Sequence, residues 1–353
     1  MKHKKYIQRC LVLAKKGIGS SRPNPSVGAV IVLNDEIIGE GYTNSYGGNH
    51  AEVNAINSVK ELSLLKEATI YVTLEPCSHF GKTPPCADLI VKHQIKNVVI
   101  GCVDPNGLVS GKGIERLKKA GCSVIVGVLE KECLEHHKRF FTVQQKKRPY
   151  IILKWAETKD GFIAPELNHD QVKKPVWISN SFSQQLVHKW RSEEHAILVG
   201  TNTVITDNPK LNVRSWTGNN PVRIILDKTL RIPDEAHVYD GSVKTIFLAE
   251  SMTHSQKDSV EKLVFEHIDF SDNLAEQICE VLYRHQIQSV IIEGGGQTLQ
   301  TFIDANLWDE ARVFEGDTVF GKGVKSPVLD KNLKQLPIEK NIEGDRLKIV
   351  VND

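Results

Sequence analysis

The first 145 residues alternate between short apolar runs and amphipathic segments, which predicts strands interleaved with helices. The apolar runs at 28–33 and 37–42 are separated by Asn34 and Asp35, a pair that is typical of a hairpin turn. We expect strands at 28–33, 37–42, 69–74, 97–102 and 123–128, and helices at 4–16, at 50–60, from Cys86 onward, at 112–120 and at 130–145. Alternating strands and helices predict an α/β layered domain.

A second alternating pattern begins at Tyr150. We expect strands at 150–156, 195–200, 222–227, 244–249 and 288–293, helices at 181–191, 256–264, 274–285 and 297–305, and further short strands at the end of the chain. This pattern predicts a second α/β domain.

A polar and basic run, Gln144-Gln145-Lys146-Lys147-Arg148-Pro149, lies between the two patterns. A proline at the end of such a run is typical of a domain border. A short loop within one domain is the alternative. We favour the border because a new pattern starts directly after it, and we expect domains at 1–145 and 148–353.

The composition fits about two soluble globular domains. The 353 residues are 40% hydrophobic and 25% charged, and 45 Lys and Arg face 43 Asp and Glu for a net charge of +2. Such a balance gives no argument for binding nucleic acid or a membrane. The seven cysteines are an odd number, which favours a reducing cytoplasm over a disulfide framework. We expect a cytoplasmic protein that binds small molecules, with no nucleic-acid or membrane partner, and that forms a homo-oligomer.

His50, Cys77 and Cys86 can supply three ligands to a zinc ion. Three protein ligands leave the fourth tetrahedral position for water, as in a catalytic zinc site. A structural zinc site would usually have a fourth Cys or His at finger-like spacing, and the sequence has none there. Three unrelated core or surface residues are the alternative, which we disfavour because each residue follows a predicted strand or begins a predicted helix.

Glu52 lies two residues after His50, at the start of a predicted helix. The two side chains would diverge in the middle of a helix, but at its first residues both can reach one site. A carboxylate beside zinc-bound water can transfer protons. H-x-E followed by P-C is the signature of zinc nucleobase deaminases. The spacing departs from that signature, because eight residues separate Cys77 from Cys86.

The segment from Pro76 to Cys86, P-C-S-H-F-G-K-T-P-P-C, closely resembles the deaminase domain of the bifunctional riboflavin-biosynthesis deaminase–reductase family. The resemblance implies an N-terminal cytidine-deaminase-like α/β/α layered domain. It also implies that five residues contact a pyrimidine and its ribose phosphate: Asn24, His79, Lys82, Asp104 and Asn106. Taken alone, Asp104-Pro105-Asn106-Gly107 is more typical of a turn. The chain departs from the family at Thr43, where a His is usual, and at Tyr46-Gly47-Gly48-Asn49, where a Gly-Glu pair is more usual.

In the second half, a predicted strand leads through Glu293 into Gly294-Gly295-Gly296 and then a helix. Strand, glycines and helix can hold a phosphate on backbone N–H groups, although by spacing alone a tight structural turn is an equal alternative.

Several motifs of the second half resemble the reductase domain of the same family. They are Lys154-x-Ala156-x-Thr158-x-Asp160-Gly161, Trp177-Ile178-Ser179, His195-Ala196-Ile197-Leu198-Val199-Gly200 and Asp207-Asn208-Pro209-x-Leu211. The resemblance, which extends from about Tyr6 to Val350, implies a C-terminal dihydrofolate-reductase-like α/β domain that binds NADPH. The implied NADPH contacts are Ala156, Trp177, Thr203, Asp207, Gly295 and Gly296.

The resemblance also implies four reductase substrate contacts: Arg191, Leu211, Arg214 and Glu293. The two arginines would hold the substrate phosphate, a task that suits their fixed charge and forked donors. Lys154 would lie near the reacting sugar and polarise or protonate it. A strand-end lysine that reaches solvent is the alternative. Pro175 stands where the family often has a Ser that touches substrate.

The zinc ligands and Glu52, together with what the resemblance implies, predict a bifunctional enzyme with zinc and NADPH as cofactors. The first half would hydrolyse the 2-amino group of 2,5-diamino-6-(5-phosphoribosylamino)pyrimidin-4-one. The second would reduce the ribosyl chain of 5-amino-6-(5-phosphoribosylamino)uracil to a ribityl chain. One alternative is a zinc deaminase of another nucleoside or nucleotide with a nucleotide-binding second domain. Another is a non-catalytic zinc module, which Glu52 argues against.

Overall fold

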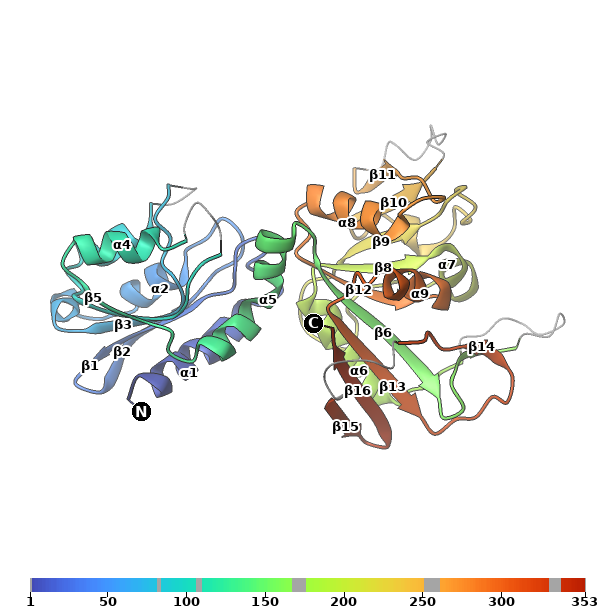
Figure 1. Cartoon of the computed structure of the whole chain (residues 1–353), viewed down its shortest axis with the longest axis horizontal. Helices are drawn as coiled ribbons and strands as arrows, with labels where there is room; N and C mark the ends of the chain where they lie inside the picture. Colours follow the sequence, from blue (N-terminus) through green and yellow to red (C-terminus); the bar gives the residue numbers. More distant parts are fainter. Residues whose placement is uncertain are drawn as a thin grey trace. The chain divides into compact units, whose positions relative to one another are not determined.

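The chain divides into two compact units, Met1–Lys147 and Arg148–Asp353 (Figure 1). The computed structural model describes residues 2–80, 84–105, 110–166, 176–250, 261–329 and 338–352. Lys82, Asn106 and Pro175 lie outside the described residues. The division falls inside the basic run that the sequence marks as a border, while the functional domain limits 1–145 and 148–353 stay a prediction.

A five-stranded sheet in the order β2-β1-β3-β4-β5 forms the centre of the first unit. Its strands are β1 (Gly28–Leu33), β2 (Glu36–Tyr42), β3 (Thr69–Leu74), β4 (Asn97–Cys102) and β5 (Ser123–Val126). β1 pairs antiparallel with β2 and β3, whereas β3, β4 and β5 are parallel. The carboxyl ends of β3 and β4 therefore lie at the same edge, where open α/β sheets bind ligands.

Helices cover both faces of this sheet (Figure 1). They are α1 (Lys2–Ala14), α2 (Ala51–Asn57), α3 (Cys86–Lys92), α4 (Lys112–Lys119) and α5 (Glu130–Lys146), with short 3-10 helices at Lys15–Gly17 and Leu62–Lys66. The resulting α/β/α layers confirm the predicted fold class of the first half.

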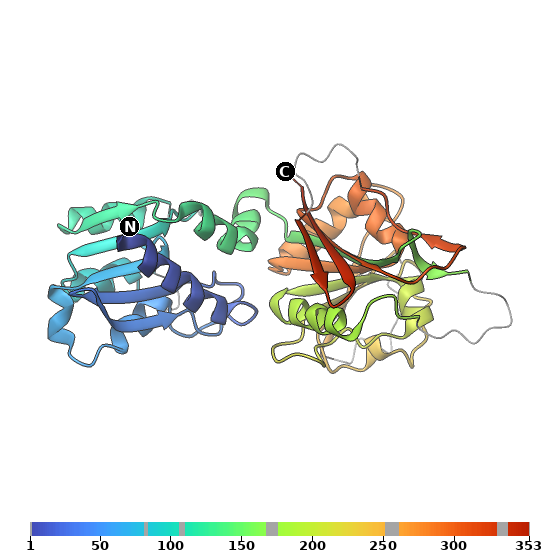
Figure 2. The same cartoon turned by 90° about the horizontal axis from the view of Figure 1, so that it is seen from below.

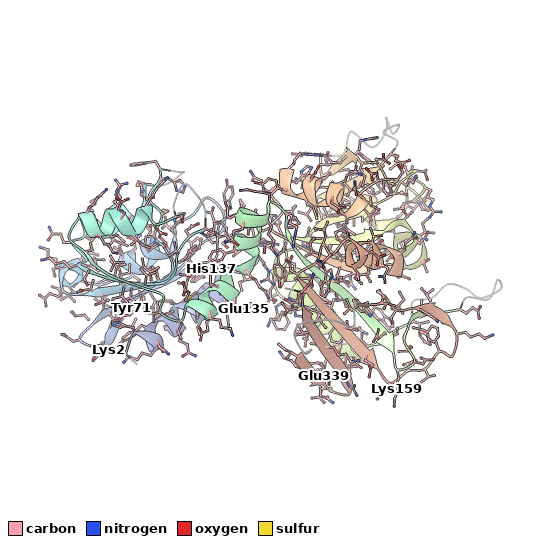
Figure 3. The ribbon with its side chains drawn as sticks, viewed as in Figure 1. Lys2, Tyr71, Glu135, His137, Lys159 and Glu339 are labelled. Carbon is pink, nitrogen blue, oxygen red and sulfur yellow. The ribbon has the colours of Figure 1, made fainter. Side chains whose placement is uncertain are left out.

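Two side chains of β3 show that α1 and α5 share one face. Tyr71 and Thr73 point to the same side because strand side chains alternate. The Tyr71 ring lies 4.8 Å from that of Tyr6 on α1, and Thr73 Oγ1 lies 3.1 Å from Nε2 of His137 on α5 (Figure 3). Burial lowers the pKa of His137 well below its ordinary value, so the ring is neutral in this core.

A nine-stranded sheet in the order β11-β10-β9-β8-β12-β6-β13-β16-β15 forms the centre of the second unit. Its strands are β6 (Tyr150–Thr158), β8 (Ala196–Gly200), β9 (Val222–Leu226), β10 (Thr245–Ala249), β11 (Leu263–His267), β12 (Ser289–Gly294), β13 (Glu310–Gly316), β15 (Ile338–Ile342) and β16 (Asp345–Val351). The strands from β11 to β13 are parallel, and β16 and β15 continue the sheet antiparallel. β7 (Phe162–Pro165) pairs separately with β14 (Gly323–Lys325).

Alternate residues of β6 belong to two hydrophobic cores on opposite faces of this sheet. Ile151 and Leu153 pack in the core that includes the buried faces of α8 (Leu274–Arg284) and α9 (Gly296–Asp304). Ile152 packs in the core with α6 (Ser181–Glu193) and α7 (Thr201–Asp207). Figure 2 shows the yellow-green α6 and the orange α8 on opposite sides of the strands.

The predicted helix at 256–264 is wrong where the structure describes it, because Leu263–His267 is strand β11 and pairs parallel with β10. Leu263 and Phe265 pack in one core while Val264 packs against the other, which is the two-residue period of a strand. The sequence analysis also missed β7 and α7. Helix α7 is rich in Thr and Asn, residues with modest helix propensity.

Candidate functional site

Three potential metal ligands from different elements converge in the first unit. His50 is the N-cap residue of α2, Cys77 follows β3, and Cys86 is the first residue of α3. His50 Nδ1 lies 3.7 Å from Cys77 Sγ and 3.3 Å from Cys86 Sγ, and the ligand atoms all lie within 4.8 Å of one another. Tetrahedral zinc with ordinary bond lengths separates a nitrogen and a sulfur ligand by about 3.6 Å. The group therefore fits a zinc ion with three protein ligands.

The surroundings of Cys77 favour loss of the proton from its thiol. Hydrogen bonding with Cys86, together with His50, holds the pKa of Cys77 at about 4 despite the opposing effect of burial. The Cys86 backbone N–H donates to Cys77 Sγ over 3.3 Å. Because zinc binds the thiolate and not the thiol, this environment favours metal binding.

Glu52 lies in the first turn of α2 and is only 4% exposed. Burial raises the pKa of its carboxyl, and nearby His50 partly offsets that effect. A buried carboxyl whose pKa is raised toward neutrality can both accept and donate a proton. Glu52 lines the same pocket as His50 and Cys77.

That pocket also contains three predicted substrate residues, Asn24, His79 and Asp104. Thr43, the residue that departs from the family pattern, lines it too, and its hydroxyl accepts a hydrogen bond from the Val27 N–H over 3.0 Å. The backbone directly before β1 therefore holds the Thr43 side chain in place.

Phe140 and Gln144 of α5 also line the pocket, and the sequence analysis missed both. They lie nearly forty residues beyond Asp104, in a helix whose end was interpreted only as a domain border. The spacing of Phe140 and Gln144, one helical turn apart, places both on one face of α5, but no motif marks that face as part of the site.

In the second unit, a buried ion pair joins α6 to the end of β12. Arg191 donates from Nε to Glu293 Oε1 over 2.8 Å and from its terminal nitrogen to Oε2 over 2.6 Å. Burial alone would raise the pKa of Glu293, but the charge and hydrogen bonds of Arg191 outweigh burial and hold the pKa at about 2. Burial lowers the pKa of nearby Lys154, while the charge of Glu293 opposes that shift.

The segment after α7 brings the other predicted substrate residues to this ion pair. Arg191 donates to the Asn212 carbonyl over 3.3 Å, and the Arg214 backbone N–H donates to His188 Nδ1 over 3.2 Å. Burial lowers the pKa of Arg214, and the charge of Arg191 lowers it further. Leu211 is buried at the start of this segment. Lys154, Arg191, Arg214 and Glu293 thus form one charged cluster.

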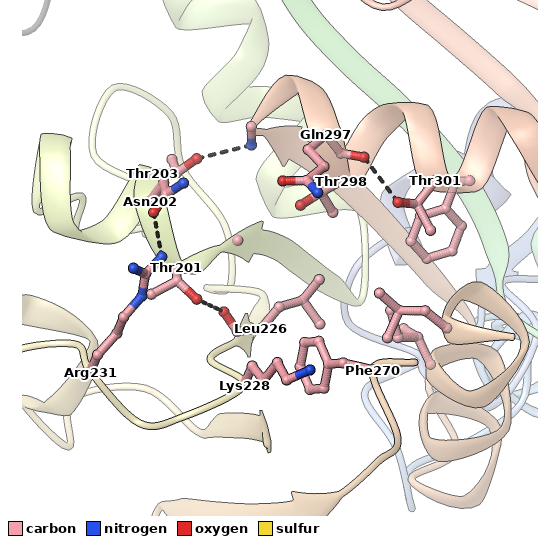
Figure 4. A pocket seen from close by; sticks show the side chains of 15 residues that line it. Thr201, Asn202, Thr203, Leu226, Lys228, Arg231, Phe270, Gln297, Thr298 and Thr301 are labelled. Atoms are coloured by element: carbon pink, nitrogen blue, oxygen red, sulfur yellow. Dashed lines mark hydrogen bonds between the residues drawn. The ribbon is translucent and has the colours of Figure 1, made fainter. Parts of the chain in front are cut away.

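A pocket of the second unit lies at the N-terminus of α9 (Figure 4). Thr203 of α7 accepts a hydrogen bond from the Gly295 N–H over 2.9 Å, and both residues line the pocket. Gly200 must be small because a Cβ there would lie 2.8 Å from Thr298 Oγ1. Two predicted cofactor residues therefore meet in a pocket at a helix N-terminus, an arrangement that can hold a phosphate.

The four remaining predicted cofactor residues do not line this pocket. Gly296 begins α9, Ala156 lies in β6, and Asp207 ends α7. Trp177 is 65% exposed. Their assignment to the cofactor stays a prediction.

Lys228 and Arg231 also line this pocket, and the sequence analysis missed them (Figure 4). Arg231 donates to Asn202 Oδ1 over 2.6 Å, and Lys228 pairs with Glu250 at 3.0 Å. Two cations directly after the apolar strand β9 were a usable signal, since strand ends line the ligand sites of parallel sheets. They give this pocket positive charge.

Asp160, which belongs to the Lys154–Gly161 motif, has a structural role. Its carboxylate accepts hydrogen bonds from the Thr158 hydroxyl and from the backbone N–H groups of Phe320 and Gly321, at 2.6 to 3.2 Å. The motif therefore combines a site residue, Lys154, with a residue that holds a turn.

Comparison with known proteins decides the family. The family model of the RibD C-terminal domain matches residues 149–348, and that of the cytidine and deoxycytidylate deaminase zinc-binding region matches residues 1–102. The riboflavin biosynthesis protein RibD of Aquifex aeolicus is 42% identical over 323 residues, covering 91% of this chain and 88% of the relative. The chain belongs to the RibD family.

Other RibD proteins support the assignment. The Escherichia coli protein is 33% identical over 346 residues, which cover 92% of this chain and 90% of the relative. A Thermotoga maritima crystal structure has a TM-score of 0.87 and 37% identity, covering 100% of this chain and 99% of that one. Its described activity is that of a diaminohydroxyphosphoribosylaminopyrimidine deaminase and 5-amino-6-(5-phosphoribosylamino)uracil reductase.

As a RibD-family protein, the chain combines a zinc-binding deaminase domain with an NADPH-dependent reductase domain and acts in riboflavin biosynthesis. The predicted family, fold class, enzyme class and cofactors are confirmed. Within the part of the chain that the structure describes, no helix is long and apolar enough to cross a membrane.

Cys86→Ser should lower zinc affinity at least tenfold and destabilise the first unit, because a neutral hydroxyl replaces a thiolate and metal binding contributes folding energy. Zinc content after dialysis, with urea unfolding followed by circular dichroism, measures both effects. Cys122→Ser is the matched control, since Cys122 is a half-buried thiol that bonds to the Ile95 carbonyl. Full zinc occupancy in Cys86→Ser would exclude Cys86 as a ligand.

Glu293 should make the stability of the second unit depend on pH. Its pKa falls from 4.5 to about 2 on folding, so its contribution is complete above pH 4.5 and is lost as the pH falls toward 2. The difference in unfolding free energy between wild type and Glu293→Gln should therefore shrink between pH 5 and pH 2.

Tryptophan fluorescence during urea unfolding reports on this unit alone, because all five tryptophans lie beyond residue 150. Glu280→Gln, an exposed change in α8, is the control. If the difference in unfolding free energy between wild type and Glu293→Gln stays constant from pH 5 to pH 2, the Arg191–Glu293 pair does not hold the pKa of Glu293 down.

Proposed function

We propose that the first unit hydrolyses the 2-amino group of 2,5-diamino-6-(5-phosphoribosylamino)pyrimidin-4-one. The second unit then reduces the ribosyl chain of the product, 5-amino-6-(5-phosphoribosylamino)uracil, to a ribityl chain. The observation that carries the proposal is the pocket in which two members of the His50–Cys77–Cys86 group, His50 and Cys77, line the same space as buried Glu52. The activity described for the similar Thermotoga maritima protein supports the choice of substrate.

In the deaminase, His50, Cys77 and Cys86 hold zinc, which when bound activates water for attack on a ring carbon. Glu52 takes up the proton that the water loses and passes it to the ring nitrogen. It then takes the proton of the new C2 hydroxyl and delivers it to the amino group, so that the C–N bond breaks, ammonia leaves and a carbonyl forms at C2. The raised pKa of Glu52 suits these transfers, because the carboxyl must accept and release protons near neutral pH.

Asn24, His79 and Asp104 surround the space next to Glu52 and orient the pyrimidine and its ribose phosphate. Lys82 and Asn106, which lie outside the described residues, keep the same proposed task. Phe140 offers an apolar wall, and Gln144 offers an amide that can both donate and accept hydrogen bonds. The pocket can thus exclude water from the ring face and bind polar ring substituents.

In the reductase, NADPH supplies the hydride when bound. The glycine-containing turn before α9, Thr203, Lys228 and Arg231 bind it, with backbone N–H groups and cations facing its phosphates. Lys154 donates a proton to the oxygen of the opened ribose as C1′ is reduced. Burial lowers the pKa of Lys154, which makes its ammonium a stronger acid and a better proton donor.

Arg214 and Arg191 bind the substrate phosphate, but they differ in how many of their N–H donors are already used within the protein. Arg214 is exposed and donates to Asn212 Oδ1 over 2.8 Å, so further donors remain for a phosphate. Arg191 already uses Nε and one terminal nitrogen on Glu293. Its main contribution is therefore positive charge at a fixed place, while Arg214 supplies most of the phosphate hydrogen bonds.

The proposal is tested by supplying the diaminopyrimidine phosphate with and without NADPH. We expect ammonia release in both cases and a fall in NADPH absorbance only when NADPH and the deaminated product are both present. Ammonia release from cytidine or adenosine in place of this substrate would favour the alternative deaminase. Homo-oligomer formation, the absence of nucleic-acid and membrane partners, and the cytoplasmic location remain predictions.

Glu52→Gln should retain zinc and the fold but lose about 10²- to 10⁴-fold in deamination rate, because a nearly isosteric amide cannot carry the proton. Reduction of the deaminated product should be unchanged in the same variant, which serves as an internal control for folding. Exposed Glu67→Gln provides a matched surface change in the first unit. Ammonia release within threefold of wild type would show that another group transfers the proton.

A further inference from the structure

Glu75, directly after β3 and two residues before Cys77, is buried and accepts four backbone hydrogen bonds from residues that the structure describes. Its Oε2 accepts from the N–H groups of Asp104 at 3.3 Å and Gly111 at 3.0 Å. Its Oε1 accepts from Gly113 at 2.9 Å and Ile114 at 3.1 Å. One carboxylate thus joins the segment that carries a metal ligand to the segment that carries Asp104.

Three of these donors belong to the beginning of α4. The first N–H groups of a helix have no partner within the helix, and Gly111 at the N-cap supplies no side-chain cap. Glu75 therefore caps α4 from another element, and its negative charge is favourable at the positive end of the helix dipole. The Glu75 carboxylate therefore holds the first turn of α4 in place.

The helix also packs closely against both cysteine segments. A Cβ at Gly113 would overlap the carbonyl oxygen of Pro76, so only glycine allows this approach. Arg116 of α4 donates to the Ser78 carbonyl over 3.1 Å and pairs with Asp88 of α3. Ser78 and Asp88, which are neighbours of Cys77 and Cys86, are thus held by Arg116 through contacts that do not involve the Glu75 carboxylate.

We propose that Glu75 is a positioning residue of the deaminase, which fixes Asp104 relative to the metal ligands. The inference rests on the proposed deaminase function. Asp104 lines the pocket with Glu52 and Cys77, and its own backbone N–H is one of the four donors to Glu75. Loss of the carboxylate removes a hydrogen bond that holds the Asp104 backbone beside the substrate. The metal ligands stay in place, because Arg116 still holds their neighbours.

Glu75→Gln is the direct test, because glutamine keeps the size but replaces one acceptor oxygen by an NH2 donor. Two of the four backbone donors then lose their partner, and an unsatisfied buried donor is costly. We expect KM for the diaminopyrimidine phosphate to rise about tenfold or more, with kcat changed less than about threefold. Zinc content and the visible absorption of the Co²⁺-substituted protein should match wild type.

A double-mutant cycle with Asp104→Asn distinguishes positioning from general stabilisation. If Glu75 acts through Asp104, the effect of Glu75→Gln on KM should shrink severalfold when Asp104 is already changed. Additive effects of the two substitutions would overturn the inference, as would a twofold or smaller change in KM. Glu115→Gln is the matched control, because Glu115 lies on the same helix in an exposed pair with Lys119.

Gly113→Ala tests the same contact if Glu75→Gln does not fold. Alanine favours the helix itself but cannot fit against Pro76, so α4 must move while the Glu75 carboxylate remains. We expect KM to rise in this variant too, and a KM equal to wild type would overturn the inference.

Hydrogen exchange separates failure of this inference from failure of the proposed function. In Glu75→Gln the amides of Asp104, Gly111, Gly113 and Ile114 should exchange faster, while those of α2 should not. This measurement needs no substrate, so it decides the role of Glu75 even if the wild-type protein released no ammonia. Unchanged exchange at these four amides would overturn the inference.

Discussion

The convergence of one imidazole and two thiols at the end of β3 is the constraint on which the first unit depends. The three ligand atoms come from residues up to 36 positions apart and yet lie within 4.8 Å of one another. Parallel pairing of β3 and β4 makes this possible, because both strands end at one edge and helices begin there. Burial of Glu52 beside the ligands then tunes a carboxyl for proton transfer.

In the second unit, candidate site residues for a different chemistry also lie at or near the carboxyl ends of parallel strands. β8, β12 and β6 are adjacent parallel strands, and their carboxyl ends lead to α7, to the glycine turn before α9, and past Lys154. The Arg191–Glu293 ion pair holds its two charges in fixed positions next to Lys154. In each unit, buried ionisable groups are stabilised by specific partners, since an unpaired buried charge would be too costly.

Sequence patterns predicted most of the framework because long apolar runs mark buried strands. β3 and β4 have exactly the predicted bounds, 69–74 and 97–102. The metal group was also predictable, since its chemistry depends on residue type. Lys228 and Arg231 were missed although cations after a buried strand are a signal, because the signal does not show which strand ends share a pocket. Arg191 donates two hydrogen bonds to Glu293, and this contact depends on how α6 lies against β12. No local sequence pattern predicts that packing.

The central claim is a zinc centre with three protein ligands and one open position beside Glu52. Zinc K-edge X-ray absorption of the full-length, zinc-loaded protein tests it most directly. We predict two sulfur scatterers at about 2.3 Å and two nitrogen or oxygen scatterers at about 2.0 to 2.1 Å, one of them an imidazole. Three or four sulfur scatterers, or a shell of nitrogen and oxygen alone, would contradict the assignment of His50, Cys77 and Cys86.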